Sequence, residues 1–315
     1  MTNTRLQRRS FLAVAASAVT APLFSLEAVA NDAQSAKGRP SLGFSLYGMK
    51  SLSLEDALKT CAEIGYSHVE LSLNAGYVTE PSAFSAESRQ AAALTLQKLK
   101  LGLPCLMVLM TLTADDKAHA ANLKLIETAA QLGRDLVPDQ PPILETILGG
   151  SPAKWNEQKA GMAARLRDWA AAAEKAKTVI ALKAHVSSAV NSPDRLLWLL
   201  DEVQSPALQV AYDYSHFELQ GIDMAESIKL LLLRTRFIHV KDSQGDAAKF
   251  QFLLPGEGRT DYVQFFSLLK QRGYTGPVCV EVSGQVFNKP NYDPIAAAKQ
   301  CHAALSKAMA QAFAS

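Results

Sequence analysis

Short apolar runs alternate with longer amphipathic segments along most of the chain. The apolar runs predict strands at 42–46, 67–71, 103–109, 142–148, 178–183, 208–211, 236–240 and 277–282. The segments that follow them predict helices at 54–64, 83–99, 115–132, 155–177, 193–203, 224–233, 260–271 and 293–313. Strands that are apolar throughout are typical of a parallel sheet covered on both faces. Eight strand–helix units in succession predict an α/β fold, a (β/α)₈ barrel.

Local signals at the ends of several segments support these boundaries. Ser53 and Ser192 stand where helix N-caps are expected, and Pro193 follows at the first helical position. Asp115 is placed to start the third helix, and Gly65 to stop the first. These residues supply the hydrogen bonds or the left-handed backbone that helix ends need.

Residues 1–30 look like a targeting segment rather than part of the fold. Arg8 and Arg9 form a twin-arginine pair, and no further charge occurs until Glu27. The run between them is rich in small and mildly apolar residues, and Ala28–Ala30 has the small-x-small pattern of a cleavage site. The segment resembles a bacterial twin-arginine (Tat) export signal, which predicts a periplasmic or exported protein.

An uncleaved membrane anchor is the alternative interpretation of this segment. Pro22 and Glu27 interrupt the apolar run, which argues against a helix of about 20 apolar residues. We therefore expect no stable membrane anchor. Residues 31–40 are small and polar and predict a flexible leader, which leaves 41–315 as one barrel domain.

The charge balance narrows the class of partner. The 315-residue chain has a formal net charge of +2, and this excess lies in residues 1–30, so the remainder is neutral. A neutral chain with no basic block favours neither nucleic acid nor an anionic membrane. A small molecule is therefore the expected partner, and a homo-oligomer is compatible with this charge balance.

The four cysteines lie in apolar segments and form no CxxC pair. Burial as small hydrophobic side chains is the leading interpretation. Cys61 and Cys301 fall on the first and last predicted helices, which are neighbours in a closed barrel. A disulfide between them is an alternative in an oxidising compartment.

Ionisable side chains end four successive predicted strands. Lys183, Asp213, His239 and Glu281 occupy these positions. In a barrel the carboxyl ends of the strands meet at one face, so these side chains should converge. Two carboxylates and an imidazole are a normal ligand set for Mn²⁺, Mg²⁺, Co²⁺ or Zn²⁺, and they also suit proton transfer at carbon. Nearby candidates for substrate binding are His185, Lys241, Glu145 and Glu70, with His216 three residues after Asp213.

From about residue 42 onward the chain resembles the xylose isomerase-like barrel superfamily of sugar isomerases and epimerases. The resemblance rests on Asp213-x-x-His216, His239-x-Lys241-Asp242, the Pro255–Gly258 loop and Glu281 at a strand end. It implies a divalent metal held by four side chains, one from each of the last four strands. Asp213, His239 and Glu281 match this pattern, whereas Lys183 replaces the usual carboxylate of the fifth strand.

Two interpretations of Lys183 remain open. In the first, a metal still binds through Asp213, His239 and Glu281, and Lys183 points away or is neutral; the three intact positions favour this choice. In the second, the Lys183 ammonium replaces the metal and pairs with Asp213 and Glu281. An ammonium 4 Å from a metal is repelled by about 4 kcal/mol per unit charge at an effective dielectric near 20.

The leading functional hypothesis is a sugar isomerase or epimerase-like enzyme that acts on an unphosphorylated sugar or keto-sugar. Glu281 would remove a proton next to a carbonyl, and Lys183 or His216 would return one. A lyase or dehydratase of keto-sugars or keto-inositols is the second hypothesis. A non-catalytic periplasmic sugar-binding barrel is the third. An endonuclease for abasic DNA would need more metal ligands and a basic face, and the sequence shows neither.

Overall fold

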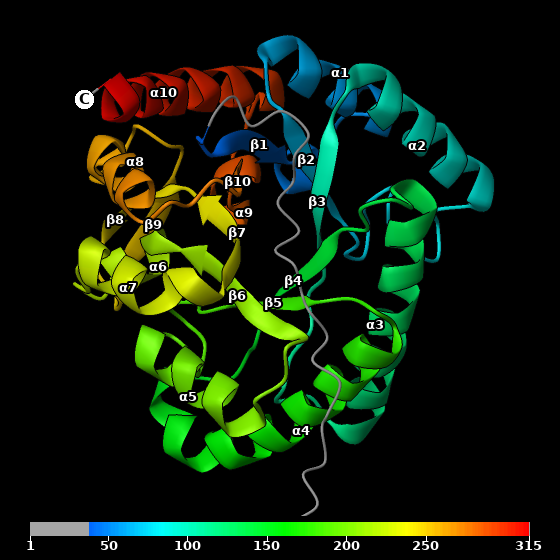
Figure 1. Ribbon diagram of the computed structural model, residues 1–315, viewed down its shortest axis with the longest axis vertical. Coiled ribbons are helices and arrows are strands. Elements are labelled where there is room, and N and C mark those ends of the chain that lie inside the picture. The colour runs from blue at the N-terminus through cyan, green and yellow to red at the C-terminus, as the bar shows by residue number, and fades with distance from the viewer. Residues whose placement is uncertain (1–37, 315) are drawn as a thin grey trace, which may run out of the picture. The chain divides into compact units, whose positions relative to one another are not determined.

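The computed structural model describes residues 38–314, which form a closed parallel barrel (Figure 1). Going round the barrel, the strand order is β1-β10-β7-β6-β5-β4-β3-β2. The strands are β1 (Ser41–Ser45), β2 (His68–Ser72), β3 (Gly102–Met107), β4 (Ile143–Ile147), β5 (Ile180–Lys183), β6 (Leu208–Asp213), β7 (Thr235–Val240) and β10 (Pro277–Val280). The predicted (β/α)₈ fold is confirmed. The predicted export signal lies outside the described residues.

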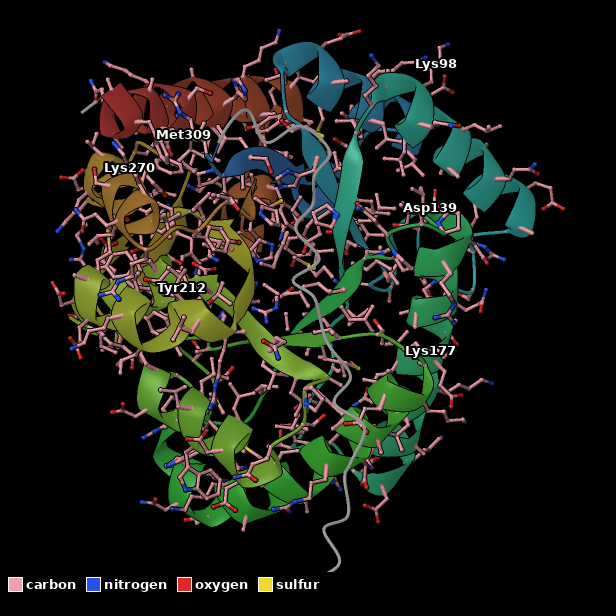
Figure 2. The ribbon with its side chains drawn as sticks, in the orientation of Figure 1. Lys98, Asp139, Lys177, Tyr212, Lys270 and Met309 are labelled. Carbon is pink, nitrogen blue, oxygen red and sulfur yellow. The ribbon has the colours of Figure 1, made fainter. Side chains whose placement is uncertain are left out.

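Long helices follow the strands and form the outer layer. They are α1 (Leu54–Ile64), α2 (Ala86–Leu99), α3 (Asp116–Leu136), α4 (Trp155–Lys175), α5 (Pro193–Val203), α7 (Met224–Leu231), α8 (Tyr262–Gln271) and α10 (Pro294–Ala314). Figure 2 shows Lys98, Lys177 and Lys270 at the periphery, and Tyr212 on β6 within the barrel and helix layers. No helix among residues 38–314 has the length and apolar content needed to cross a membrane.

The predicted helix ends are realised by the expected contacts. The side chains of Ser53, Asp115 and Ser192 each accept a hydrogen bond from a backbone N–H in the first turn of α1, α3 and α5. Gly65 ends α1 with φ 105°, a left-handed conformation that favours glycine. Each such cap stabilises a helix by about 1 kcal/mol.

Apolar side chains pack on both faces of the barrel strands. The larger core lies between strands and helices and includes Phe44, Leu106 and Trp169. A small second cluster, made of Cys105, Phe237 and Cys279, lies apart from it. The Phe237 ring lies 5.0 Å from the ring of His239, two residues further along β7 and on the same side of the strand. This cluster therefore fills the barrel beneath the ionisable residues at the mouth.

The barrel interior is also close-packed at β1, which gives a test of the fold. A Cβ on Gly43 would lie 2.1 Å from Cδ2 of His68, a buried side chain. We expect Gly43→Ala to lower the free energy of unfolding by about 1–3 kcal/mol, because the ring has to move in a packed interior. Gly161 in α4 has open space around its Cβ position and serves as the control. Gly161→Ala should stabilise the helix slightly, and urea unfolding of both variants measures the difference.

The structure also contains elements that the pattern did not predict. The antiparallel hairpin of β8 (Asp242–Gly245) and β9 (Phe250–Leu253) follows β7, and the short helices α6 (Tyr214–Glu218) and α9 (Gly284–Phe287) follow β6 and β10. The Pro255–Gly258 loop is fastened to the hairpin, because Gly256 N–H donates to Asp242 Oδ2 at 2.7 Å. Each of these additions lies after the carboxyl end of a barrel strand, on the face expected to carry the site.

The cysteines confirm the leading prediction. All four are buried free thiols. The alternative disulfide between Cys61 and Cys301 is not formed, and the Cys61 thiol lies 3.9 Å from Met49 Sδ instead.

Candidate active site

The four predicted strand-end residues converge at the mouth of the barrel. Lys183 and Asp213 are the last residues of β5 and β6, His239 is the penultimate residue of β7, and Glu281 directly follows β10. These strands are neighbours in the order β5-β6-β7-β10. Register brings Asp213 directly opposite His239. The ligand atoms of Asp213, His239 and Glu281 all lie within 4.8 Å of one another.

Lys183 points into this cluster and contacts three acceptors. Its Nζ lies 2.9 Å from Nδ1 of His239 and 3.1 Å from Oε1 of Glu281, both in hydrogen-bond geometry. Oε1 of Glu145 lies 3.0 Å away in an ion pair. Two of the three contacts of this ammonium group are hydrogen bonds, and the third is an ion pair. Lys183 therefore does not point away from the cluster. The expected pair with Glu281 is formed, whereas Glu145 and His239 are its other partners in place of Asp213.

Lys241 is a second ammonium in the same cluster. Its Nζ donates to Oδ2 of Asp213 and to Oε2 of Glu281. The Phe252 ring of the β8–β9 hairpin lies 5.0 Å from this nitrogen, within cation–π distance. Glu281 consequently bridges two lysines, one through each carboxylate oxygen. Lys241 was predicted as a substrate-binding residue, and the structure shows it held by two carboxylates.

Glu70 and Glu145 lie deeper than the sequence suggested. Their exposed fractions are 0% and 1%. Oε2 of Glu70 lies 3.0 Å from Nε2 of His239, and Glu145 faces Lys183. Substrate binding by both residues stays a prediction; in this structure Glu70 contacts the imidazole and Glu145 contacts the ammonium group.

His216 and His185 stand beside Asp213. Nδ1 of His216 accepts a hydrogen bond from the Val186 N–H, so the ring proton is on Nε2, 3.4 Å from Oδ2 of Asp213. The two imidazole rings lie 4.2 Å apart. Burial lowers the pKa of His216 to about 4 and that of His185 to about 2. Both rings are therefore neutral at physiological pH, and neither is a ready proton donor.

The charged side chains of the cluster shift one another's pKa values and so determine which of them are protonated. Burial opposes the ammonium form of Lys183, but Glu145 and Glu281 outweigh it and hold its pKa well above the usual value. Burial would raise the pKa of Glu281, yet Lys183, Lys241 and His239 hold it well below the ordinary value. Asp213 behaves likewise, with Lys241 as the main opposing charge. Lys183 is thus an ammonium, and Glu281 and Asp213 are carboxylates, throughout the physiological range.

Glu145 is the exception among the carboxylates. Burial raises its pKa, and the ammonium of Lys183 only partly offsets this effect. His239 has a raised pKa, because Glu70 and Glu281 outweigh the opposing effects of burial and Lys183. The Lys183 ammonium can donate only to an unprotonated Nδ1, which leaves the imidazole proton on Nε2, facing Glu70.

Aromatic side chains form walls around the mouth. Tyr47, just after β1, stacks on Tyr77 with ring centroids 5.6 Å apart and meets Phe287 of α9 edge-on at 5.0 Å. Burial and the nearby Glu281 carboxylate raise the pKa of Tyr47. Across the cluster, the Phe252 ring lies 5.2 Å from that of His216. The sequence pattern did not predict these walls, although aromatic residues that follow strand ends were the available signal.

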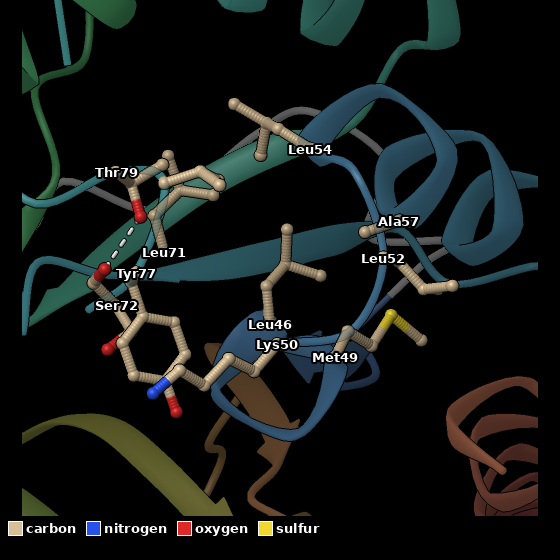
Figure 3. Close-up of a pocket in the computed structure, with 11 residues that line it drawn as sticks. Leu46, Met49, Lys50, Leu52, Leu54, Ala57, Leu71, Ser72, Tyr77 and Thr79 are labelled. Atoms are coloured by element: carbon tan, nitrogen blue, oxygen red, sulfur yellow. Dashed lines mark hydrogen bonds between the residues drawn. The ribbon is translucent and has the colours of Figure 1, made fainter. Parts of the chain in front are cut away.

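A separate pocket lies on the β1–β2 side of the barrel (Figure 3). Its lining is largely apolar, with Lys50 and Tyr77 at one side, and it includes no residue of the ionic cluster. The Thr79 hydroxyl donates to the Ser72 carbonyl at 2.6 Å and fixes the loop that forms its wall. We assign no chemistry to this pocket, because it brings together no reactive groups.

The cluster contains a candidate metal ligand set, but its donor atoms are engaged. Lys183 takes Nδ1 of His239 and Oε1 of Glu281, and Lys241 takes Oε2 of Glu281 and Oδ2 of Asp213. A divalent ion 4 Å from one ammonium would be repelled by about 8 kcal/mol at an effective dielectric near 20. A metal does not fit these side chains as they are arranged.

The comparisons with known proteins agree with the fold. The family model described as xylose isomerase-like TIM barrel matches residues 58–305, and the chain belongs to this family. The L-ribulose-5-phosphate 3-epimerase UlaE of Shigella flexneri is 24% identical over 198 residues, which cover 62% of this chain and 67% of that protein. The family resemblance inferred from the strand-end motifs is confirmed.

Two solved structures share the architecture at low sequence identity. The IOLI protein with a bound zinc atom superimposes with a TM-score of 0.73 at 18% identity, covering 87% of this chain and all of that one. The 3-keto-D-glucoside 4-epimerase YcjR of E. coli gives a TM-score of 0.67 at 14% identity, covering 85% of this chain and all of that one. At these identities the likeness establishes the fold.

Proposed function

We propose that this protein is a sugar isomerase or epimerase that removes a proton next to a carbonyl group, with an unphosphorylated sugar or keto-sugar as substrate. The observation that carries the proposal is the position of Glu281. It is an ionised carboxylate at the mouth, bracketed by two ammonium groups. The epimerase activities named for two relatives support the reaction class, although the substrate named for UlaE is a sugar phosphate.

Glu281 is the cluster carboxylate that a substrate can reach. Its side chain is 12% exposed, whereas those of Asp213, Glu70 and Glu145 are 0–1% exposed. As an ionised group it is in the form that accepts a proton. The ammonium groups beside it lower its basicity, but they also lie where they can hydrogen-bond a carbonyl oxygen and stabilise the negative charge that develops there.

Lys183 is the group we assign to charge stabilisation and proton return. It is adjacent to Glu281 and remains an ammonium, so it can donate to the oxygen of an enediolate. His216 was the other predicted acid. Its low pKa and its orientation toward Asp213 favour a positioning role for it.

Two features favour a substrate without a phosphate group. Both ammonium groups of the cluster are already paired with carboxylates, which leaves no unpaired cation there for a phosphate. The aromatic walls formed by Tyr47 and Phe252 suit the apolar face of a sugar ring. The predicted export signal points the same way, since sugar phosphates are scarce outside the cytoplasm.

Solvent deuterium exchange tests the proposal. A panel of unphosphorylated ketoses and keto-glycosides is incubated with the protein in D₂O and followed by NMR. We expect deuterium to enter a substrate at the carbon next to its carbonyl, together with a new diastereomer or positional isomer. An unsaturated product absorbing in the ultraviolet would assign the lyase instead. Binding without exchange across the panel would favour the sugar-binding barrel and contradict the proposal.

A further inference from the structure

Nδ1 of His239 and the carboxylate oxygens of Asp213 and Glu281 are each already hydrogen-bonded to a lysine or to a hydroxyl group. Lys183 occupies His239 Nδ1 and Glu281 Oε1, at 2.9 and 3.1 Å. Lys241 occupies the remaining Glu281 oxygen and one oxygen of Asp213. The other Asp213 oxygen accepts from the Ser215 hydroxyl at 2.7 Å. The set is complete without an ion.

The two lysines also match a divalent ion in charge and in the atoms they contact. Together they carry two positive charges, and between them they contact all three candidate ligands. The exposed fraction of each lysine is 3%, and Glu145 beneath Lys183 supplies a further negative charge. Buried ammonium groups persist only where partners satisfy them, so this arrangement is a built cation site rather than a chance contact.

We propose that the Lys183–Lys241 pair takes the place of a divalent cation, so that the site is assembled and works without a metal, and that Lys183 is the residue that keeps a metal out. The lysine pair would occupy the position of the metal whichever small molecule binds at the mouth of the barrel. Replacing Lys183 by a carboxylate frees His239 Nδ1 and Glu281 Oε1 and adds an acceptor beside them. The Lys183→Glu variant should therefore gain a metal site.

Zinc uptake measured by equilibrium dialysis and elemental analysis tests the proposal. The full chain is compared with Lys183→Glu and with the double variant Lys183→Glu/Asp213→Asn, and circular dichroism monitors the fold. We expect no stoichiometric Zn²⁺ in the unsubstituted protein. Lys183→Glu should take up one Zn²⁺ per chain with an affinity higher on the order of 100-fold or more, and the double variant should lose it.

Thermal melting of the unsubstituted protein provides a second measurement that needs no variant. Its melting temperature should be the same with EDTA and with added Zn²⁺, because no resident ion stabilises the fold. The proposal is overturned if the unsubstituted protein binds one Zn²⁺ that Asp213→Asn removes, or if EDTA lowers its melting temperature. A folded Lys183→Glu variant that gains no Zn²⁺ overturns it as well. If this variant does not fold, uptake and melting of the unsubstituted protein decide.

Discussion

The Glu281→Gln variant is expected to lose about 10²- to 10⁴-fold in kcat on the substrate found by deuterium exchange. Glutamine keeps the shape and one acceptor oxygen of Glu281 but cannot take up a proton. Exchange of the proton next to the carbonyl should fall by a similar factor, because this step depends directly on the base. Turnover and NMR exchange rates measure both effects.

Glu218→Gln is the matched control for this variant. As whole residues, Glu218 and Glu281 have the same exposed fraction of 9%, but the Glu218 carboxylate accepts hydrogen bonds from the Ser243 and Thr260 hydroxyls rather than from the two lysines of the cluster. It should retain kcat within a small factor. Equal losses in the two variants would point to a general structural effect, and an unchanged rate in Glu281→Gln would remove Glu281 from the mechanism.

The pH dependence of the unsubstituted enzyme follows from the same contacts. The lysines hold the pKa of Glu281 well below its ordinary value. A base with a lowered pKa stays ionised as the pH falls, so the acid limb of kcat/KM due to Glu281 should lie below the usual carboxyl pKa of about 4.3. A loss of activity centred near neutral pH would assign the base to another group.

The second large effect concerns stability. Lys183→Met is expected to lower the free energy of unfolding by about 3–5 kcal/mol, because it leaves the buried carboxylates of Glu145 and Glu281 without their shared cation. Urea unfolding at neutral pH measures the change. Adding Glu145→Gln to Lys183→Met should recover part of the loss, since the Glu145 carboxylate beside the missing ammonium group is then removed, while Glu281 still pairs with Lys241.

Lys175→Met is the surface control. Lys175 pairs with Glu127 at 2.6 Å, a shorter separation than those of Lys183, but its side chain is 77% exposed. Water screens such a pair, so its removal should change the unfolding free energy far less. If Lys183→Met lowered the free energy of unfolding as little as Lys175→Met does, the buried cluster would not be the stabilising cation site described above.

The arrangement also indicates which groups act directly and which position others. Glu70 contacts Nε2 of His239, which carries the ring proton, and Nδ1 on the other side of the ring faces Lys183. Glu145 stands under Lys183, and Ser215 fixes one oxygen of Asp213. Among the carboxylates of the cluster, the Glu281 side chain is the most exposed and lies where a substrate would first meet it. The deeper residues keep the ammonium groups in place at the mouth.

The amino-acid sequence by itself determined the barrel, its helix caps and the convergence of Lys183, Asp213, His239 and Glu281. Apolar runs and amphipathic segments depend on local spacing, and a parallel barrel necessarily brings its strand ends to one face. The pattern did not predict the β8–β9 hairpin, whose short strands carry too few residues for a clear alternation.

Only the tertiary structure decided what these side chains do to one another. Whether Lys183 avoids or occupies the centre of the site depends on its side-chain direction and on the depth of Glu145, one strand away in the barrel. The pairing of Lys241 with Glu281 likewise depends on the register of β7 and β10. Ion pairing acts over a few ångströms between residues far apart in sequence, so spacing along the chain cannot specify it.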